Sequence, residues 1–236
     1  MQKVEEFIEA VKNYRNGFHP VVSFNAEADK LLPLDFTENN KELNDVVVND
    51  TELFSKYITG KLEQARATYG IGGYNEHRTV YSRSAVFDAG EEPRRLHLGV
   101  DIWSHAGTSV YAPLEGTVHS FAFNDAFGDY GATLILQHEV DGIIFHTLYG
   151  HLSLHSSADK REGQTVEKGE WIAAFGEPAE NGNWPPHLHF QIILNMQGMK
   201  GDYPGVCKFS ERDRYLQNCP DGDLLLQLNQ YATAQS

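Results

Sequence analysis

The sequence is poor in cysteine and in basic residues, and it contains no long apolar run. Only two cysteines occur in 236 residues, Cys207 and Cys219, which is too few for a disulfide framework and agrees with two free thiols or with one bond. The 19 basic residues stand against 33 acidic ones, and the net charge of −14 argues against a nucleic-acid partner. No stretch reaches the ~18 apolar residues of a membrane-spanning helix, so a membrane protein is excluded.

The first residues also lack the features of a secretory signal. Glu5 and Glu6 interrupt the apolar run that such a signal requires. The chain as written is therefore expected in the cytoplasm. A periplasmic or secreted location stays open if residues precede Met1.

Length and composition indicate one large domain with an added segment. The hydrophobic fraction of 41% and the charged fraction of 22% are ordinary for a globular protein. We expect a helical N-terminal segment with a linker over residues 1–79, a β-sheet catalytic domain over residues 80–200 and a tail over residues 201–236 that packs on this domain. The oligomeric state is left undetermined.

The N-terminal segment has helical spacing. An apolar stripe runs through residues 4–11, and a second helix is predicted around residues 50–69. Residues 31–34 are predicted as an extended linker. The glycines of residues 70–75 indicate a connector, with a loop over a substrate cleft as the alternative.

From about residue 80 the spacing of apolar residues changes from the helical period to a period of two residues, which is typical of strands. Several runs rich in β-branched and aromatic residues follow, separated by turn signals such as Asp141-Gly142, and their short spacing favours antiparallel hairpins. These runs are residues 110–123, 133–138, 143–149, 171–175 and 187–194. The sequence therefore predicts an α+β, β-dominated fold with an antiparallel sheet core and a helical N-terminal segment.

Two pairs of residues in this region suit a metal site. His187 and His189 lie two apart on a predicted strand and so project from one face, and His97 and Asp101 have an even spacing that also shares a face. One histidine of the first pair, together with the second pair, would give the three protein ligands of an open catalytic zinc site. The second histidine of the strand is then free for another role.

The candidate base must come from outside a zinc-binding helix. His138-Glu139 is not followed by the second histidine of a His-Glu-x-x-His motif, whereas His151 ends a predicted strand and has a suitable intrinsic pKa. The spacing of His97 and Asp101 recurs at His155 and Asp159. That second copy lies among serines and a lysine and is interpreted as a solvated loop.

Four ordered motifs resemble the lysostaphin-type zinc peptidases, the M23 or LytM-like family, over roughly residues 95–194. The motifs are His97-Leu98-Gly99-Val100-Asp101, Ala112-Pro113-Leu114-Glu115-Gly116-Thr117-Val118, Tyr149-Gly150-His151-Leu152 and His187-Leu188-His189-Phe190. The resemblance implies a LytM-type sheet with duplicated hybrid motifs and cleavage of peptides in peptidoglycan, often beside glycine or D-alanine. It also implies about one Zn²⁺ per chain, with ligands His97, Asp101 and His189, and with His151 and His187 as catalytic histidines.

Some positions depart from the common family pattern. Trp184-Pro185-Pro186 precedes the histidine pair and Gln191 follows it, which most resembles the intracellular M23-like domains fused to aminotransferases. A non-catalytic LytM-like binding or regulatory module is the alternative function. Arg94 and Arg95 are either contacts for a substrate carboxylate or part of a solvated face.

Overall fold

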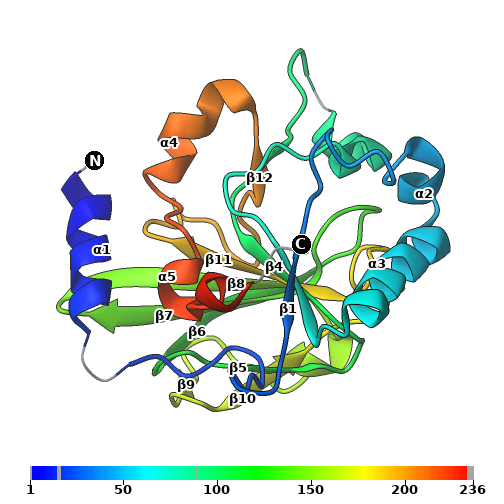
Figure 1. The fold of residues 1–236 in the computed structure, drawn as a ribbon. Coiled ribbons are helices and arrows are strands. Elements are labelled where there is room, and N and C mark those ends of the chain that lie inside the picture. Colours follow the sequence, from blue (N-terminus) through cyan, green and yellow to red (C-terminus); the bar gives the residue numbers. More distant parts are fainter. Residues whose placement is uncertain (1, 15–16, 89, 233–236) are drawn as a thin grey trace.

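The computed structural model describes residues 2–14, 17–88 and 90–232, and strands dominate it (Figure 1). Met1 and residues 233–236, at the predicted outer ends of the N-terminal segment and of the tail, lie outside the described residues. The α-helices are α1 (Gln2–Asn13), α2 (Asp45–Asn49), α3 (Thr51–Ala65), α4 (Arg212–Leu216) and α5 (Asp223–Leu226). The strands are β1 (Leu31–Leu34), β2 (Tyr69–Gly72), β3 (Leu96–His97), β4 (Val100–Trp103), β5 (Ser109–Tyr111), β6 (Gly116–Asn124), β7 (Gly131–Val140), β8 (Ile143–Leu152), β9 (Thr165–Val166), β10 (Trp171–Ala174), β11 (His187–Ile193) and β12 (Val206–Cys207). Short 3₁₀ helices are η1 (Val80–Arg83), η2 (Ala85–Phe87), η3 (Leu154–Ser157), η4 (Phe209–Glu211) and η5 (Asn229–Tyr231).

Eight of the described strands form one sheet in the order β1-β2-β4-β11-β8-β7-β6-β9. Its neighbouring strands are antiparallel, apart from the parallel pair of β1 and β2. The predicted β-dominated, mostly antiparallel fold is thus confirmed. Strand β11 lies between β4 and β8 and is buried along its whole length. The two predicted site histidines of this strand therefore lie in the middle of the sheet.

The N-terminal segment takes part in this sheet, which the sequence did not indicate. The prediction of a linker at residues 31–34 is wrong, because these residues form the edge strand β1, with Pro33 as its one exposed residue. Proline is tolerated there because an edge strand has no neighbour for one of its sides. The first half of the predicted connector, residues 70–72, belongs to strand β2, and residues 73–75 lie outside the strand. The predicted helix around residues 50–69 is confirmed over α3, which ends where Arg66 adopts a left-handed conformation.

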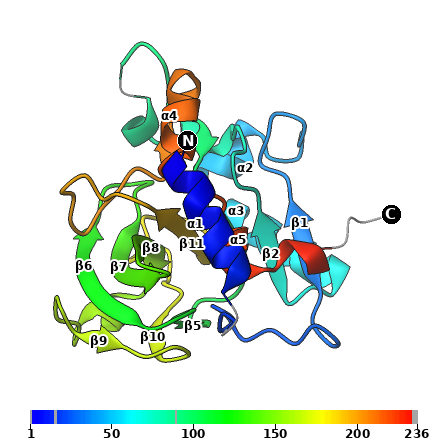
Figure 2. The ribbon, with the colours of Figure 1, turned by 90° about the vertical axis from the view of Figure 1, so that its left-hand side faces the viewer.

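The helices cover different parts of the sheet (Figure 2). Helix α1 packs beside α5, and its fully buried Phe7 contacts Phe145 of β8 with 4.8 Å between ring centroids. Helix α3 contributes Phe54, whose ring lies 6.1 Å from Trp103 of β4 and 6.3 Å from Trp184. The longest described helix, α3, has 15 residues, and none of the described helices has the length and apolar character needed to cross a bilayer.

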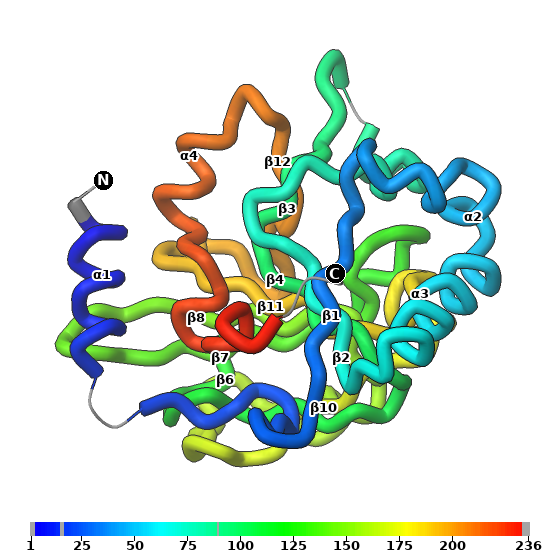
Figure 3. Tube along the Cα trace, in the orientation of Figure 1, coloured from blue at the N-terminus to red at the C-terminus, as the bar shows by residue number. Residues whose placement is uncertain are grey.

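Two connections tie the ends of the chain to the sheet. The segment between α1 and β1 runs along the β5–β10 pair (Figure 3), where the Tyr111 amide donates to the Val21 carbonyl at 2.8 Å. In the tail, β12 pairs with β3, so Val206 lies opposite His97. Cys207 and Cys219 are both free thiols and both buried.

Candidate metal centre

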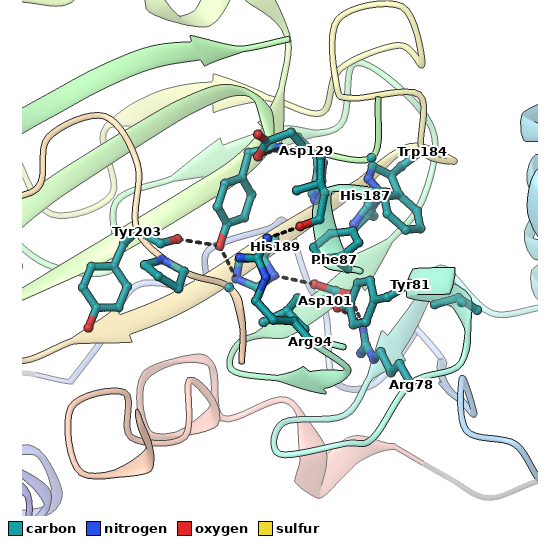
Figure 4. Close-up of a pocket in the computed structure, with 18 of the residues that line it drawn as sticks. Arg78, Tyr81, Phe87, Arg94, Asp101, Asp129, Trp184, His187, His189 and Tyr203 are labelled. Carbon is teal, nitrogen blue, oxygen red and sulfur yellow. Dashed lines mark hydrogen bonds and ion pairs between the residues drawn. The ribbon is translucent and has the colours of Figure 1, made fainter. Parts of the chain in front are cut away.

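Three of the predicted site residues converge at one point in the middle of the sheet (Figure 4). His97 ends β3, while Asp101 of β4 lies directly opposite His189 of β11 in the strand register. Nε2 of His97 lies 3.0 Å from Nδ1 of His189, and each of these atoms lies 3.1 Å from Oδ1 of Asp101. All three side chains are buried, with exposed fractions of 0–3%. The strand pairing therefore brings together residues that are far apart in the sequence.

The two ligand imidazoles turn lone pairs toward each other. Nδ1 of His97 lies 2.9 Å from the Gly73 carbonyl, which can only accept a hydrogen bond, so Nδ1 carries the proton and Nε2 is bare. Nε2 of His189 lies 2.9 Å from Oε1 of Gln191, which leaves Nδ1 of His189 bare. The Gln191 orientation follows from its amide nitrogen, which donates to the Pro204 carbonyl at 3.2 Å.

Three acceptor atoms thus face one another with no proton between them. Such an arrangement is repulsive unless a cation occupies the centre. A triangle with sides of 3.0–3.1 Å has a circumradius of about 1.8 Å, which is shorter than the zinc–ligand distance of about 2.0–2.2 Å and so admits one ion in contact with all three atoms. Two imidazoles and one carboxylate are ligands that zinc favours. The residues present therefore fit one zinc ion.

Two motif glycines make room for this packing. A Cβ atom on Gly99 would lie 2.6 Å from the His189 ring, and one on Gly150 would lie 2.5 Å from the Tyr130 ring. Any side chain at Gly99 would therefore push a metal ligand out of place. His151, which follows Gly150, has a left-handed backbone with φ of 62°, a conformation that is costly for a residue other than glycine.

A buried arginine holds the second oxygen of the carboxylate ligand. The guanidinium of Arg78 contacts Oδ2 of Asp101, while its Nε donates to Glu76 at 2.7 Å. Burial alone would favour the neutral acid, but neighbouring His97 and Arg78 hold the pKa of Asp101 well below its ordinary value. Asp101 is therefore ionised, with one oxygen on the arginine and the other toward the two histidines.

His151 and His187 lie beside the three ligands and face each other, with 4.1 Å between their ring centroids. Nδ1 of His151 donates to the Asn181 carbonyl at 2.7 Å, and Nδ1 of His187 donates to the Pro185 carbonyl at 2.8 Å. The His187 ring also stacks on Trp103 at 3.9 Å. Each ring therefore has a protonated Nδ1 and a bare Nε2 that can accept a proton.

The same burial keeps these imidazoles neutral. Loss of solvation lowers the pKa of His187 to about 4 and lowers the pKa of His151 well below its ordinary value. Both rings are consequently in their proton-accepting form at neutral pH. Carbonyl oxygens on the far side of each ring prevent the opposite tautomer.

Four of the five residues, all except His97, border one cavity of about 160 Å³. Its other walls come from the segment before β3 and from the loop before β12, so it is bounded by elements outside the central sheet. The cavity wall also includes Tyr81, Phe87, Arg94, Asp129, Asp202 and Tyr203. Desolvation raises the pKa of Asp129 and Asp202.

Comparison with known proteins agrees with this geometry. The model of peptidase family M23 matches residues 95–200, a range that contains the four site histidines and Asp101. Residues 95–200, somewhat less than half of the chain, are therefore similar to peptidase family M23. The family resemblance expected from the four sequence motifs is thereby confirmed.

Curated relatives share this M23 region. An uncharacterized metalloprotease of Haemophilus influenzae is 39% identical over 101 residues, which are 43% of this chain and 19% of the relative. A DD-carboxypeptidase/endopeptidase of Neisseria meningitidis is 33% identical over 140 residues, or 57% of this chain and 30% of the relative. An L-Ala–D-Glu endopeptidase of Bacillus subtilis is 33% identical over 135 residues, or 52% and 39%. The chain thus spans well under half the length of these relatives.

Solved structures also align with parts of the chain. A zinc-containing peptidase from Vibrio cholerae is 29% identical with a TM-score of 0.33, and the match covers 42% of this chain and 27% of that one. The solution structure of lysostaphin is 23% identical with a TM-score of 0.33, covering 54% and 46%.

The region that matches the M23 model brings together the five residues that the resemblance assigns to the site, and the discarded copy lies elsewhere. His155 and Asp159 are both exposed, in agreement with their interpretation as a solvated loop. Sequence reasoning missed the contacts of Arg78 and of the Gly73 carbonyl, both contributed by residues that precede the matched range. A buried arginine beside a glycine-rich run carries no local signal for such a role.

Proposed function

We propose that this protein is a zinc-dependent metallopeptidase that hydrolyses peptide bonds, with His97, Asp101 and His189 as ligands. The observation that carries the proposal is the meeting of three buried acceptor atoms without a proton, beside two neutral histidines with bare Nε2 atoms. The first group suits a cation, and the second suits proton transfer. The match to the M23 family supports the same reading.

Zinc, when bound, polarises a carbonyl oxygen and makes water easier to deprotonate. The chain's own contribution is the pair His151 and His187, whose Nε2 atoms accept a proton from water and return it to the leaving amine. The Asn181 and Pro185 carbonyls keep both rings in the required tautomer. Trp103 fixes the plane of His187 by stacking, so little reorientation is needed during turnover.

The proposed substrates are short peptides of the peptidoglycan type. The relatives are named for DD-carboxypeptidase and endopeptidase activity and for cleavage between L-Ala and D-Glu. The cavity is smaller than the ~300–1,000 Å³ that encloses a drug-sized ligand, which suits a short, small-residue peptide. A suitable panel contains a peptide ending in D-Ala-D-Ala, one with an L-Ala–D-Glu bond and pentaglycine.

The test compares alanine variants of the individual histidines. His189→Ala is expected to lose both zinc and activity, because it removes a ligand. His151→Ala and His187→Ala are expected to keep about one zinc per chain and to lose roughly 10²–10⁴-fold in kcat, the usual contribution of a positioned proton-transfer group. His155→Ala, an exposed histidine from the discarded pair, is the matched control and should behave as wild type. Elemental analysis and peptide hydrolysis are measured on the same samples.

Different failures have different meanings. Zinc retained by His189→Ala but lost by His187→Ala would reverse the two roles on β11. Stoichiometric zinc with no hydrolysis of any panel peptide would favour a non-catalytic binding module. Two tightly held metal ions per chain would contradict the single site.

A further inference from the structure

The cavity beside the metal centre contains an arginine that the proposed chemistry does not use. Arg78 and Arg94 both line this cavity, but Arg78 is committed to Asp101 and Glu76. Arg94 is half-buried, lies over the Phe87 ring at 5.6 Å and donates from one terminal nitrogen to the Val86 carbonyl. Among the described residues Arg94 has no ion-pair partner.

The neighbouring arginine shows the contrast. Arg95 forms an ion pair with Asp88 and donates to the Arg94 carbonyl, and it does not line the cavity. The two arginines, adjacent in sequence, therefore have different environments. Arg95 is paired and its side chain is only 12% exposed, whereas Arg94 makes one hydrogen bond and its charge acts on Asp129 and Asp202 without an ion pair.

The surroundings of Arg94 argue for an anionic ligand. The protein has a net charge of −14, and Asp129 and Asp202 line the same cavity, so an anion would be repelled without a local cation. Neither aspartate forms an ion pair with Arg94 in the described structure, and Oδ1 of Asp129 is occupied by the Tyr130 amide. The guanidinium thus remains available, and its planar fork matches the geometry of a carboxylate.

We propose that Arg94 binds a carboxylate of the peptide substrate, within about one residue of the bond that is cut. The distance follows from the cavity, which at about 160 Å³ holds both Arg94 and the catalytic histidines on its walls. The substrate class is therefore a peptide with a free carboxylate next to the scissile bond. This inference rests on the proposed peptidase function (Figure 4).

The experiment uses a peptide ending in D-Ala-D-Ala in two forms, with a free C-terminal carboxylate and with a C-terminal carboxamide. Binding is measured by calorimetry on the zinc-loaded full chain carrying His187→Ala, so that the peptide stays intact. Hydrolysis of the same two peptides is measured without that substitution. The chain is then compared with its Arg94→Gln, Arg94→Lys and Arg95→Gln variants.

The free acid is expected to bind about 10- to 100-fold more tightly than the amide, as for a charge-assisted hydrogen bond. Arg94→Gln should remove this preference by weakening only the acid. Arg94→Lys should keep part of it, because the charge remains without the fork. Arg95→Gln is the matched control and should keep all of it. An unchanged Kd for the amide shows that the Arg94 variants remain folded.

Each outcome supports or contradicts one proposal. Equal affinity for acid and amide in the unsubstituted chain, or a preference that survives Arg94→Gln, overturns the role of Arg94 even if both peptides are cut. Loss of the preference in Arg95→Gln as well would assign the effect to the shape of the loop and also overturn it. A preference that depends on Arg94 without any hydrolysis would support the binding site and count against the peptidase.

Discussion

At His189 side chains decide which nitrogen faces the metal centre: Oε1 of Gln191 lies 2.9 Å from Nε2, and the Tyr130 hydroxyl lies 3.5 Å from the same atom. The partners of the other three site imidazoles are backbone carbonyls, whereas His189 uses Oε1 of Gln191. Gln191 is itself fully buried, and its amide group also contacts Sγ of Cys219 at 3.3 Å. This one tautomer can therefore be changed by mutation.

Gln191→Leu is expected to lower zinc affinity by about 10- to 100-fold, the usual cost of losing the partner of a metal-binding histidine. Without the acceptor, His189 gains the alternative of protonating Nδ1, which cannot bind the ion. Gln191→Glu keeps an acceptor and should lose less. Thr133→Val removes a buried hydroxyl on β7 and serves as the control for general destabilisation. Competition with a chromophoric chelator measures the affinities, and equal losses in Gln191→Leu and Thr133→Val would contradict the role.

Arg78 and Asp101 form an ion pair that is almost completely buried. Arg78→Met should destabilise the zinc-free protein by about 3–5 kcal/mol, because the carboxylate is left in the interior without its cation. Combined with Asp101→Asn, the loss should be clearly smaller than the sum of the two single losses. Arg83, which is also buried but bonded to Thr51, is the control, and Arg83→Met should be additive with Asp101→Asn. Urea denaturation with a chelator measures these free energies, and additivity for Arg78 would contradict the coupling.

The site residues differ in how visible they are in the sequence. His187 and His189 could be predicted because a strand places residues two apart on one face, and the family motifs supplied the division of roles. The Gly73 carbonyl and Arg78 could not, because their contacts with His97 and Asp101 span 24 and 23 residues and depend on tertiary packing. The sequence alone does not distinguish a substrate contact from a solvated face at Arg94, because its place on the cavity wall depends on the fold.

Among the elements, α1 packs on the sheet far from the metal centre. Phe7 contacts Phe145, which precedes His151 by six residues and therefore by about 20 Å along β8. Phe7→Ala is expected to destabilise the protein by about 3–5 kcal/mol through the cavity it leaves. Zinc affinity should stay within about twofold of wild type. Thermal denaturation and metal titration check both statements, and a large loss of zinc affinity would show that α1 supports the site.

Local pattern predicted the elements where one period dominated. The apolar stripe of α3 buries one face of the helix, and the runs rich in β-branched and aromatic residues at β7 and β8 are buried on both faces, so these patterns were sufficient. Strand β1 was missed because proline at position 33 suggested a linker, and only its place at the edge of the sheet makes the residue acceptable. Its partner β2 was hidden by glycines. One of these, Gly70, approaches β1 so closely that a Cβ atom would lie 2.5 Å from the Leu34 side chain.

The molecule as a whole should be sensitive to acid in its zinc-free form. Burial lowers the pKa of His97, His138 and His187 to about 4, and that of His151 further below its ordinary value. In the unfolded state these groups protonate near pH 6.5, so below this pH the unfolded chain binds more protons than the folded one. The free energy of unfolding therefore falls as the pH decreases from about 6.5 toward 4.

His146, whose pKa burial also lowers to about 4, is a fifth such group, so the slope should approach about 7 kcal/mol per pH unit at its steepest. The raised pKa values of Asp129 and Asp202 act in the opposite direction, above their ordinary value of 3.8, and reduce the slope at the acid end. Urea denaturation at pH 7.5, 6.5 and 5.5 with a chelator measures it. His138→Gln should lower the slope by about 1.4 kcal/mol per pH unit, because it removes one of these groups. A stability that is constant over this range would contradict the prediction.

The position of β11 has a consequence for the order in which the protein is made. This strand is inserted between β4 and β8, although both of these leave the ribosome long before it. Until residue 193 has been synthesised, β4 and β8 lack their shared neighbour, and the zinc site has only His97 and Asp101. A sheet completed by so late a strand depends on contacts of long sequence separation, which form slowly. The proposed metal centre therefore cannot be complete on a chain that ends before β11, and it forms only after this central strand is in place.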